Sequence, residues 1–236
     1  MNTILKIILA IIFPISCFGI TEYQSGNKLF IWAESGLNLR ESADFKSNVL
    51  TKIPFAKEVI CLGYKSWYEY LNDSHKLKDK TKLTNGKTIE IELKGNWVKV
   101  KFESYEGFVF DVYLSRFKPF PKKEDFLSLF DFFKEGCDSL IYLEKKGPSL
   151  EDGRDKIVFS NGIFMTKNYH SGSFEFQMNL PDFSIEEAFL IIRYLHKDAI
   201  EITQKKDGVI WIDQDSGGYT IEPYKNFVII TGEWSC

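Results

Sequence analysis

The sequence predicts a mainly β protein in two parts, a small all-β domain followed by an α+β domain with two helices on an antiparallel sheet. From residue 29 to residue 117 the chain consists of short strand-like segments separated by turn residues, without a helical period. Beyond residue 124, two segments with helical spacing of apolar residues are each followed by about four strand-like runs. The composition, 44% hydrophobic and 16% aromatic, is sufficient for a folded core.

Residues 1–19 have the layout of a secretory signal peptide. Lys6 supplies a positive charge, residues 7–13 form an apolar segment, and small residues come next. The apolar segment is shorter than the ~20 residues that a membrane-spanning helix needs. We therefore expect export to the periplasm or the cell surface. Residues 14–17 also resemble a lipobox, which makes Cys17 a lipidation candidate and a lipid anchor the one predicted contact with a membrane.

Three cysteines lie beyond the leader, at positions 61, 137 and 236. In an oxidising compartment two of them can form one disulfide. Cys137 with Cys236 is the candidate pair, because both fall in the second half whereas Cys61 lies in an apolar strand. The spacings contain no C-x-x-C and no nearby histidine pair, which argues against zinc. The sequence predicts no metal and no cofactor.

The first domain carries five short motifs in a particular order. They are G-L-N-L-R-E-S at 36–42, N-V-L-T-K-I at 48–53, K-E-V at 57–59, N-W-V-K-V at 96–100 and E-G-F-V-F-D-V-Y-L at 106–114. Together they resemble the motifs of a bacterial SH3 (SH3b) domain over residues 29–117. The resemblance implies an SH3-like β-barrel domain at 28–117, with a hairpin insertion at 67–95.

In SH3-like barrels, aromatic and polar side chains beside the hairpin loops form a shallow groove for peptides. The resemblance therefore implies a ligand-binding surface, and the candidate residues are Trp67, Tyr68, Tyr70 and Tyr105. Trp97 and Tyr113 align with core-facing positions of the family and are expected to be structural.

The insertion contains a hairpin whose register can be argued from charge. Lysines alternate along residues 76–82, and glutamates alternate with apolar residues along 89–93. A two-residue turn would place lysines opposite isoleucines. A three-residue loop at 84–86, with Gly86 left-handed, places lysines opposite glutamates, which adds ~0.2–1 kcal/mol per pair. The expected pairs are Lys80 with Glu90, Lys78 with Glu92 and Leu77 with Leu93.

This register also bears on nucleic-acid binding. The alternating lysines look like a comb for phosphate groups, but opposite the glutamates they form the solvated face of a hairpin. Over the whole chain, 30 Lys and Arg stand against 33 Asp and Glu, a formal net charge of −3. We therefore expect no nucleic-acid partner.

A proline-punctuated linker at 118–123 leads to the α+β domain at 124–236. The first predicted helix follows apolar residues from Phe126 to Phe133 and stops at Gly136. The second opens at a capping box formed by Ser184 and Glu187. The strand-like runs are 139–145, 156–159, 162–167 and 173–180, then 199–205, 209–214, 219–222 and 226–231. One helix and about four strands in each half suggest a duplication, although the halves share no side-chain motif.

The second domain lacks a recognisable catalytic set. Cys137 is the one candidate nucleophile, and it follows a predicted helix, so no helix N-terminus lowers its pKa. His170 and His196 are available as bases, but three scattered histidines do not form a zinc-peptidase motif. Paired carboxylates for a glycosidase occur at 186–187 and 213–215, and the latter read as a strand end and turn. We predict that the protein is not an enzyme.

The predicted function is that of an exported, non-catalytic cell-envelope protein. Its SH3b-like domain would bind a peptide-like ligand, either peptidoglycan or a protein partner. Two alternatives stay open: a cell-wall hydrolase that depends on Cys137 with His170, and a surface lipoprotein that mediates cell contact.

Overall fold

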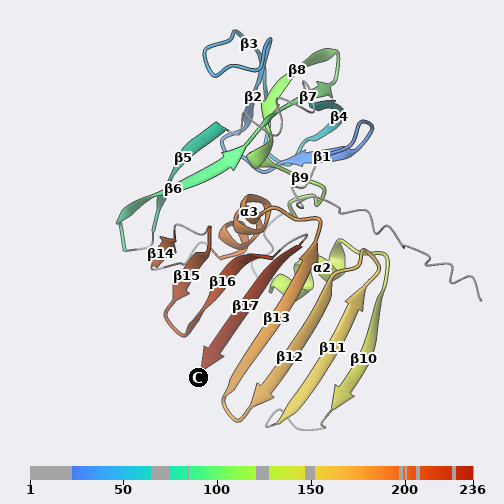
Figure 1. The fold of residues 1–236 in the computed structure, drawn as a ribbon, viewed down its shortest axis with the longest axis vertical. Helices are drawn as coiled ribbons and strands as arrows, with labels where there is room; N and C mark the ends of the chain where they lie inside the picture. The colour runs from blue at the N-terminus through green and yellow to red at the C-terminus, as the bar shows by residue number, and fades with distance from the viewer. Residues whose placement is uncertain are drawn as a thin grey trace, which may run out of the picture.

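The computed structural model describes residues 23–64, 75–83, 85–120, 128–146, 152–196, 199, 201–205, 208–224 and 227–235. In these residues the chain forms a seven-stranded sheet, an eight-stranded sheet, a separate two-stranded hairpin and two α-helices (Figure 1). The mainly β architecture with antiparallel sheets is therefore confirmed.

Several predictions fall outside the described residues. They concern the leader with Cys17, the candidate binding residues Trp67, Tyr68 and Tyr70, and Cys236 of the candidate disulfide. Within the described part of the chain, no helix has the length and apolar character to cross a membrane.

The first sheet is antiparallel, with the strand order β3-β2-β8-β7-β4-β1-β9. Its elements are β1 (Lys28–Ile31), β2 (Leu37–Arg40), β3 (Val49–Ile53), β4 (Glu58–Tyr64), β7 (Trp97–Phe102), β8 (Tyr105–Phe110), the 3-10 turn η1 (Asp111–Tyr113) and β9 (Leu114–Ser115). Alternate residues point to one face, as the two-residue period of a strand requires. Leu29, Leu39, Val98 and Val100 are fully buried there. Trp97 is also buried, as expected.

The first sheet is not closed into the barrel that the sequence predicts. In the described residues, the terminal strands β3 and β9 each pair with one neighbour and not with each other. Closure of a barrel requires the two end strands to run side by side. β9 is only two residues long, and Phe117, two residues after it, already packs against Phe133 and Phe183 of the second part. β9 therefore offers too little backbone to complete a ring.

The hairpin has the predicted register. In β5 (His75–Lys82) and β6 (Thr88–Gly95), Lys80 lies opposite Glu90, Lys78 opposite Glu92 and Leu77 opposite Leu93. Gly86 has the expected left-handed conformation, with φ of 81°. The ion pairs run diagonally, from Lys78 to Glu90 at 2.6 Å and from Lys76 to Glu92 at 2.9 Å.

The second sheet has the strand order β10-β11-β12-β13-β17-β16-β15-β14, and all its neighbours are antiparallel. The elements are α2 (Leu129–Glu135), β10 (Leu140–Lys146), β11 (Gly153–Phe159), β12 (Phe164–His170), β13 (Ser173–Pro181), α3 (Ile185–Leu195), β14 (Glu201–Gln204), β15 (Ile210–Gln214), β16 (Gly217–Tyr224) and β17 (Phe227–Ser235). Each half is one helix followed by a four-stranded meander, and the last strands of the two halves pair at the centre.

Serine N-caps begin both helices. Ser128 and Asp131 form a reciprocal capping box at α2, which ends at Gly136 as predicted. At α3, the Ser184 side chain accepts a hydrogen bond from the backbone N–H of Glu187 at 3.0 Å. The Glu187 side chain does not close the predicted box and instead reaches the first sheet. Helix α3 thus lies between the two sheets (Figure 1).

The first sheet has its own buried core, and the core of the second part extends to Trp32 and the hairpin. Trp32 of the first part packs edge-on against Phe132 of α2 and Tyr194 of α3, with ring centroids 5.8 and 5.5 Å apart. Its indole N–H donates to the carbonyl of Phe117 at 2.8 Å. The Tyr194 hydroxyl donates to the carbonyl of Phe120 at 2.5 Å, so the described part of the predicted linker is packed in place.

Candidate functional site

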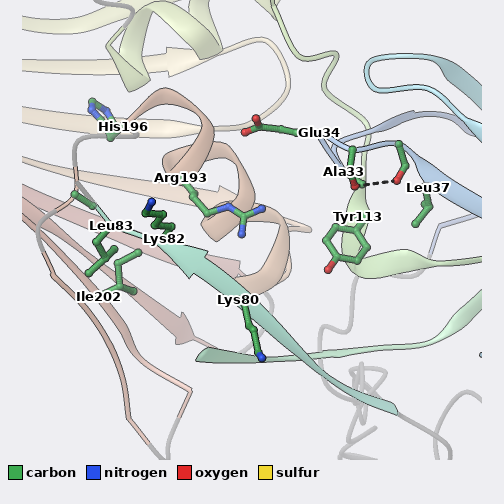
Figure 2. Close-up of a pocket in the computed structure, with 13 residues that line it drawn as sticks. Ala33, Glu34, Leu37, Lys80, Lys82, Leu83, Tyr113, Arg193, His196 and Ile202 are labelled. Carbon is green, nitrogen blue, oxygen red and sulfur yellow. Dashed lines mark hydrogen bonds between the residues drawn. The ribbon is translucent and has the colours of Figure 1, made fainter. Parts of the chain in front are cut away.

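A cleft of about 540 Å³ lies where the first sheet, the hairpin and α3 meet (Figure 2). Its walls come from the loop at 33–37, the end of the hairpin at Lys80–Leu83, and the C-terminal end of α3 with β14. The volume is within the range of small-molecule and peptide side-chain sites. It is the candidate functional site because segments far apart in the sequence build it together.

The loop at 33–37 is a tight turn that depends on glycine. Gly36 has φ of 82°, and its N–H donates to the carbonyl of Ala33 at 2.8 Å. A Cβ atom at position 36 would lie 2.9 Å from the carbonyl oxygen of Ile53. Glycine therefore permits both the left-handed turn and the close approach to β3. The turn leaves Glu34 exposed at the rim of the cleft.

The hairpin contributes two lysines that its own glutamates do not neutralise. Lys76 and Lys78 form ion pairs with the two glutamates of β6. Lys80 and Lys82 continue the same face of β5 into the cleft and are exposed. Among the described residues neither forms an ion pair. The predicted solvated face is therefore present, and its last two lysines also line a cavity.

Helix α3 adds a third cation. The half-buried Arg193 points into the cleft (Figure 2), and its guanidinium carbon lies 5.5 Å from the centre of the Phe189 ring. His196 caps the helix, where its N–H donates to the carbonyl of Ile192 at 2.8 Å. The His196 ring is buried and hydrogen-bonds to the hydroxyl of Tyr219.

The cleft therefore combines positive charge with an apolar floor. Lys80, Lys82 and Arg193 oppose one carboxylate, that of Glu34. Leu37, Leu83, Ala199 and Ile202 are buried and form the apolar part of the lining. Such a lining suits a ligand with a carboxylate and a short apolar group beside it, because paired charges and apolar contact then form together.

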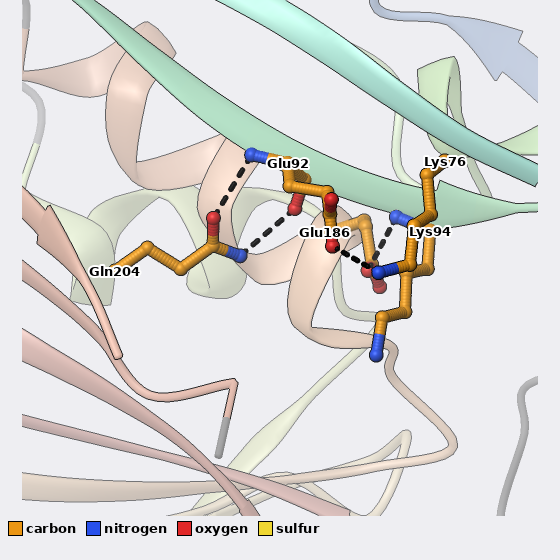
Figure 3. A network of polar contacts seen from close by, with 5 residues as sticks. All are labelled: Lys76, Glu92, Lys94, Glu186 and Gln204. Carbon is orange, nitrogen blue, oxygen red and sulfur yellow. Dashed lines mark hydrogen bonds and ion pairs between the residues drawn. The ribbon is translucent and has the colours of Figure 1, made fainter. Parts of the chain in front are cut away.

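A polar brace holds the hairpin beside α3 and β14 (Figure 3). The side-chain amide of Gln204 accepts from the backbone N–H of Glu92 at 2.9 Å and donates to its carbonyl at 2.8 Å. Glu186 of α3 accepts from the backbone N–H of Lys94 at 3.1 Å. Burial raises the pKa of Glu186, although the hydrogen bond from Lys94 opposes the shift.

A buried carboxyl group joins α3 to the first sheet. Glu187 accepts from the Ser115 hydroxyl at 2.6 Å and from the backbone N–H of Arg116 at 3.3 Å. Burial raises its pKa, while the charge of Arg116 acts in the opposite direction. Its contacts lie within the protein and away from the cleft, so we assign Glu187 a structural role.

The structure separates the residues of the alternative catalytic site. Cys137 lies beside Asn161, and Asn161 is in the turn that precedes β12. His170 is the last residue of β12, at the other end of that strand. Seven strand residues span about 20 Å, so the two side chains cannot form a dyad. Burial also raises the pKa of the Cys137 thiol, and His170 lies 3.7 Å from Asp152.

Of the predicted ligand-binding residues, Tyr105 is the one within the described chain. It is exposed at the start of β8, while Tyr113, which lines the cleft, follows the other end of that strand. Tyr105 therefore does not belong to the cleft. No pattern in the sequence pointed to Glu34 or Arg193 as members of a site. The hairpin strands hold more lysines than glutamates, and this excess was the sequence signal that pointed to Lys80 and Lys82.

No family model, no curated protein and no solved structure matched this chain.

Proposed function

We propose that this chain is an exported, non-catalytic cell-envelope protein that binds a peptide-like ligand, peptidoglycan stem peptide or the terminus of a protein partner, in the cleft. In this proposal residues 28–117 are an SH3b-like module whose barrel is left open. The module supplies the loop at 33–37 and the hairpin lysines. The α+β part supplies Arg193 and the floor.

One observation carries the proposal: three cations surround an apolar floor in a cleft shared by both parts of the chain. Peptide termini and stem peptides present a carboxylate next to small apolar side chains. Lysine and arginine bind such a carboxylate through charge-assisted hydrogen bonds. The leader-like residues 1–19 support an envelope location.

A sedimentation assay with purified peptidoglycan sacculi tests the proposal. The mature protein should sediment with sacculi at low salt, and Lys80→Gln with Lys82→Gln should weaken this by about tenfold, because two of the three cations are lost. The matched control is Lys46→Gln with Lys101→Gln, which removes the same charge from exposed positions outside the cleft. Equal sedimentation of all three proteins would refute the role of the cleft.

A second measurement separates peptidoglycan from a protein partner. Calorimetry with a synthetic stem peptide should show binding for the free acid and at least tenfold weaker binding for the C-terminal amide. If sacculi and stem peptide both fail to bind, the wall-binding form of the proposal is wrong, and peptides with other free C-termini are the remaining ligands to titrate.

Location is tested separately. Expressed from its full chain, the protein should be found in the periplasmic or surface fraction, and labelling with a clickable fatty acid that is lost in Cys17→Ser would identify a lipoprotein. Retention of the unprocessed chain in the cytoplasm would contradict the envelope proposal.

A further inference from the structure

A second cavity, of about 320 Å³, lies on the helix-covered face of the eight-stranded sheet, beside the start of α2. One side of its lining is aromatic and apolar, with Phe130, Met165, Phe174, Phe176, Tyr219 and Trp234. The other side is polar and includes Gln214, Ser216 and one carboxylate, that of Asp215. Of the residues around the two cavities, His196 alone belongs to both. The proposed peptide-binding cleft therefore does not account for this pocket.

The pocket has a flat aromatic wall. The Trp234 ring stacks on Phe174 at 5.1 Å with an interplanar angle of 16°, and on Phe176 at 5.8 Å with an angle of 6°. Tyr219 meets the same indole edge-on at 4.8 Å. A Cβ atom at Gly232 would lie 2.6 Å from the indole, so this glycine makes room for the wall. Such walls favour planar apolar groups, which stack or meet them edge-on.

The pocket also contains a positive charge, that of Lys167. Lys167 is half-buried, and its Nζ lies 4.8 Å from the centre of the Phe174 ring and 5.0 Å from that of Tyr169. Among the described residues it forms no ion pair. Burial lowers its pKa, and the charges of Asp155 and Asp131 only partly compensate.

Both of those carboxylates are already engaged elsewhere. Asp155 accepts a hydrogen bond from the Tyr169 hydroxyl at 3.2 Å. Asp131 accepts from the Ser128 hydroxyl at 2.5 Å in the capping box of α2. A carboxylate brought by a ligand would therefore meet a partly dehydrated ammonium group, where a charge-assisted hydrogen bond is strongest.

We propose that this pocket binds a small aromatic carboxylic acid, with the carboxylate on Lys167 and the ring against the wall formed by Phe174, Phe176 and Trp234. The volume suits one bicyclic ring system and no large ligand. The apolar walls exclude a fully polar anion, and the lysine gives the acid an advantage over its neutral analogue.

Calorimetric titration of the full chain with 2-naphthoate and 2-naphthamide tests the proposal, because the two probes share a ring system and differ in charge. The acid should bind at least tenfold more tightly than the amide. In Lys167→Met, which keeps the length of the side chain, the acid should bind no better than the amide. Lys156→Met is the matched control, since Lys156 lies on the opposite face of the sheet in an ion pair with Glu144.

Amide spectra recorded by NMR show that each variant is folded and place the probe. The Trp234 indole signal should shift on titration with 2-naphthoate, and Phe174→Ala should weaken binding by about tenfold. Equal affinity for acid and amide, equal losses in the two lysine variants, or no binding of 2-naphthoate at millimolar concentration would each overturn the proposal. The protein with both Lys80→Gln and Lys82→Gln should bind 2-naphthoate as the wild type does, so the proposal for this pocket is tested independently of the proposal for the cleft.

Discussion

The two halves of the eight-stranded sheet have the same topology and different surroundings. In the first half, α2 covers β10–β13 and buries Leu129, Phe132 and Phe133. In the second half, α3 lies between its own strands and the first sheet, and even a carboxyl side chain, that of Glu187, is buried. Both helices reach the first part. Helix α2 does so through the packing of Phe132 on Trp32, and α3 through the packing of Tyr194 on Trp32 and the hydrogen bond between Glu187 and Ser115.

The difference shows which contacts couple the two parts. Glu186, Glu187 and Tyr194 of α3 contact residues of the hairpin, of β9 and of the segment after it. These contacts fix the position of Arg193 in the cleft. Variants of α3 and of its partners should therefore cost more than equivalent variants of α2, and the expected effects below run from the largest to the smallest.

Truncation of a core phenylalanine in each helix is the most direct comparison. Phe189 of α3 is fully buried, so Phe189→Ala should lower the free energy of unfolding by about 3–5 kcal/mol. Phe130 of α2 is only partly buried, and Phe130→Ala should cost about 1–2 kcal/mol. Urea unfolding followed by circular dichroism measures both. Equal losses would contradict the difference in burial between the two positions.

The carboxyl groups around α3 should make stability depend on pH. Asp111, in the turn that contacts α3, accepts hydrogen bonds from the Asn96 N–H at 2.8 Å and the Tyr64 hydroxyl at 3.2 Å. Burial nevertheless raises its pKa to about 7. Because the folded state holds this proton more tightly than the unfolded state, its contribution is complete below about pH 4 and is lost as the pH rises to about 7.

Wild-type stability relative to Asp111→Asn should therefore fall by about 1–3 kcal/mol between pH 4 and pH 8. Unfolding in urea at several pH values measures this difference. The matched control is Asp44→Asn, which removes one carboxyl group from an exposed position in the 41–48 loop. A difference that rises with pH would contradict the sign.

Loss of the Gln204 amide should weaken the attachment of the hairpin to β14. Gln204→Ala removes two hydrogen bonds to the backbone of Glu92 and should cost about 1–2 kcal/mol. Gln177→Ala, on the exposed face of the central strand β13, removes a single bond to Asn179 and should cost less than about 0.5 kcal/mol. Hydrogen exchange should become faster in the hairpin amides for the first variant only.

The surface ion pairs of the hairpin should contribute least. Lys78→Gln removes the exposed pair with Glu90 and should leave the unfolding temperature almost unchanged, with a still smaller effect at high salt. A thermal unfolding series at two salt concentrations measures it. A clear loss of stability at both salt concentrations would show that these pairs do more than set the register.

Local features of the fold followed from the sequence, whereas the contacts between its parts did not. Charge pairing predicted the hairpin register, and the glycine at 136 predicted the end of α2. The apolar stripe of α3, which includes Ala188, Phe189 and Ile192, identified one buried face but not the burial of Leu190 and Ile191 opposite it. Apolar residues on two faces of a helix indicate that both faces are buried, but they do not indicate which elements cover them.

The cleft was unpredictable for a related reason. Lys80, Lys82 and Arg193 become neighbours only when the hairpin folds across α3, a long-range contact that no local pattern encodes. Closure of the barrel was predicted from motif order, which carries no information on the length of β9. Glu187 was assigned to a cap because its spacing from Ser184 fits one, and the nearby hydroxyl of Ser115 proved the stronger partner.

The position of β17 constrains how the chain acquires its fold. β17 is the last strand of the sheet in sequence and lies at its centre, between β13 and β16. Until it emerges from a ribosome or a translocation channel, β13 has an open edge that can pair with another chain. The central pairing of this sheet, between β13 and β17, therefore has to wait until residues 227–235 have been synthesised.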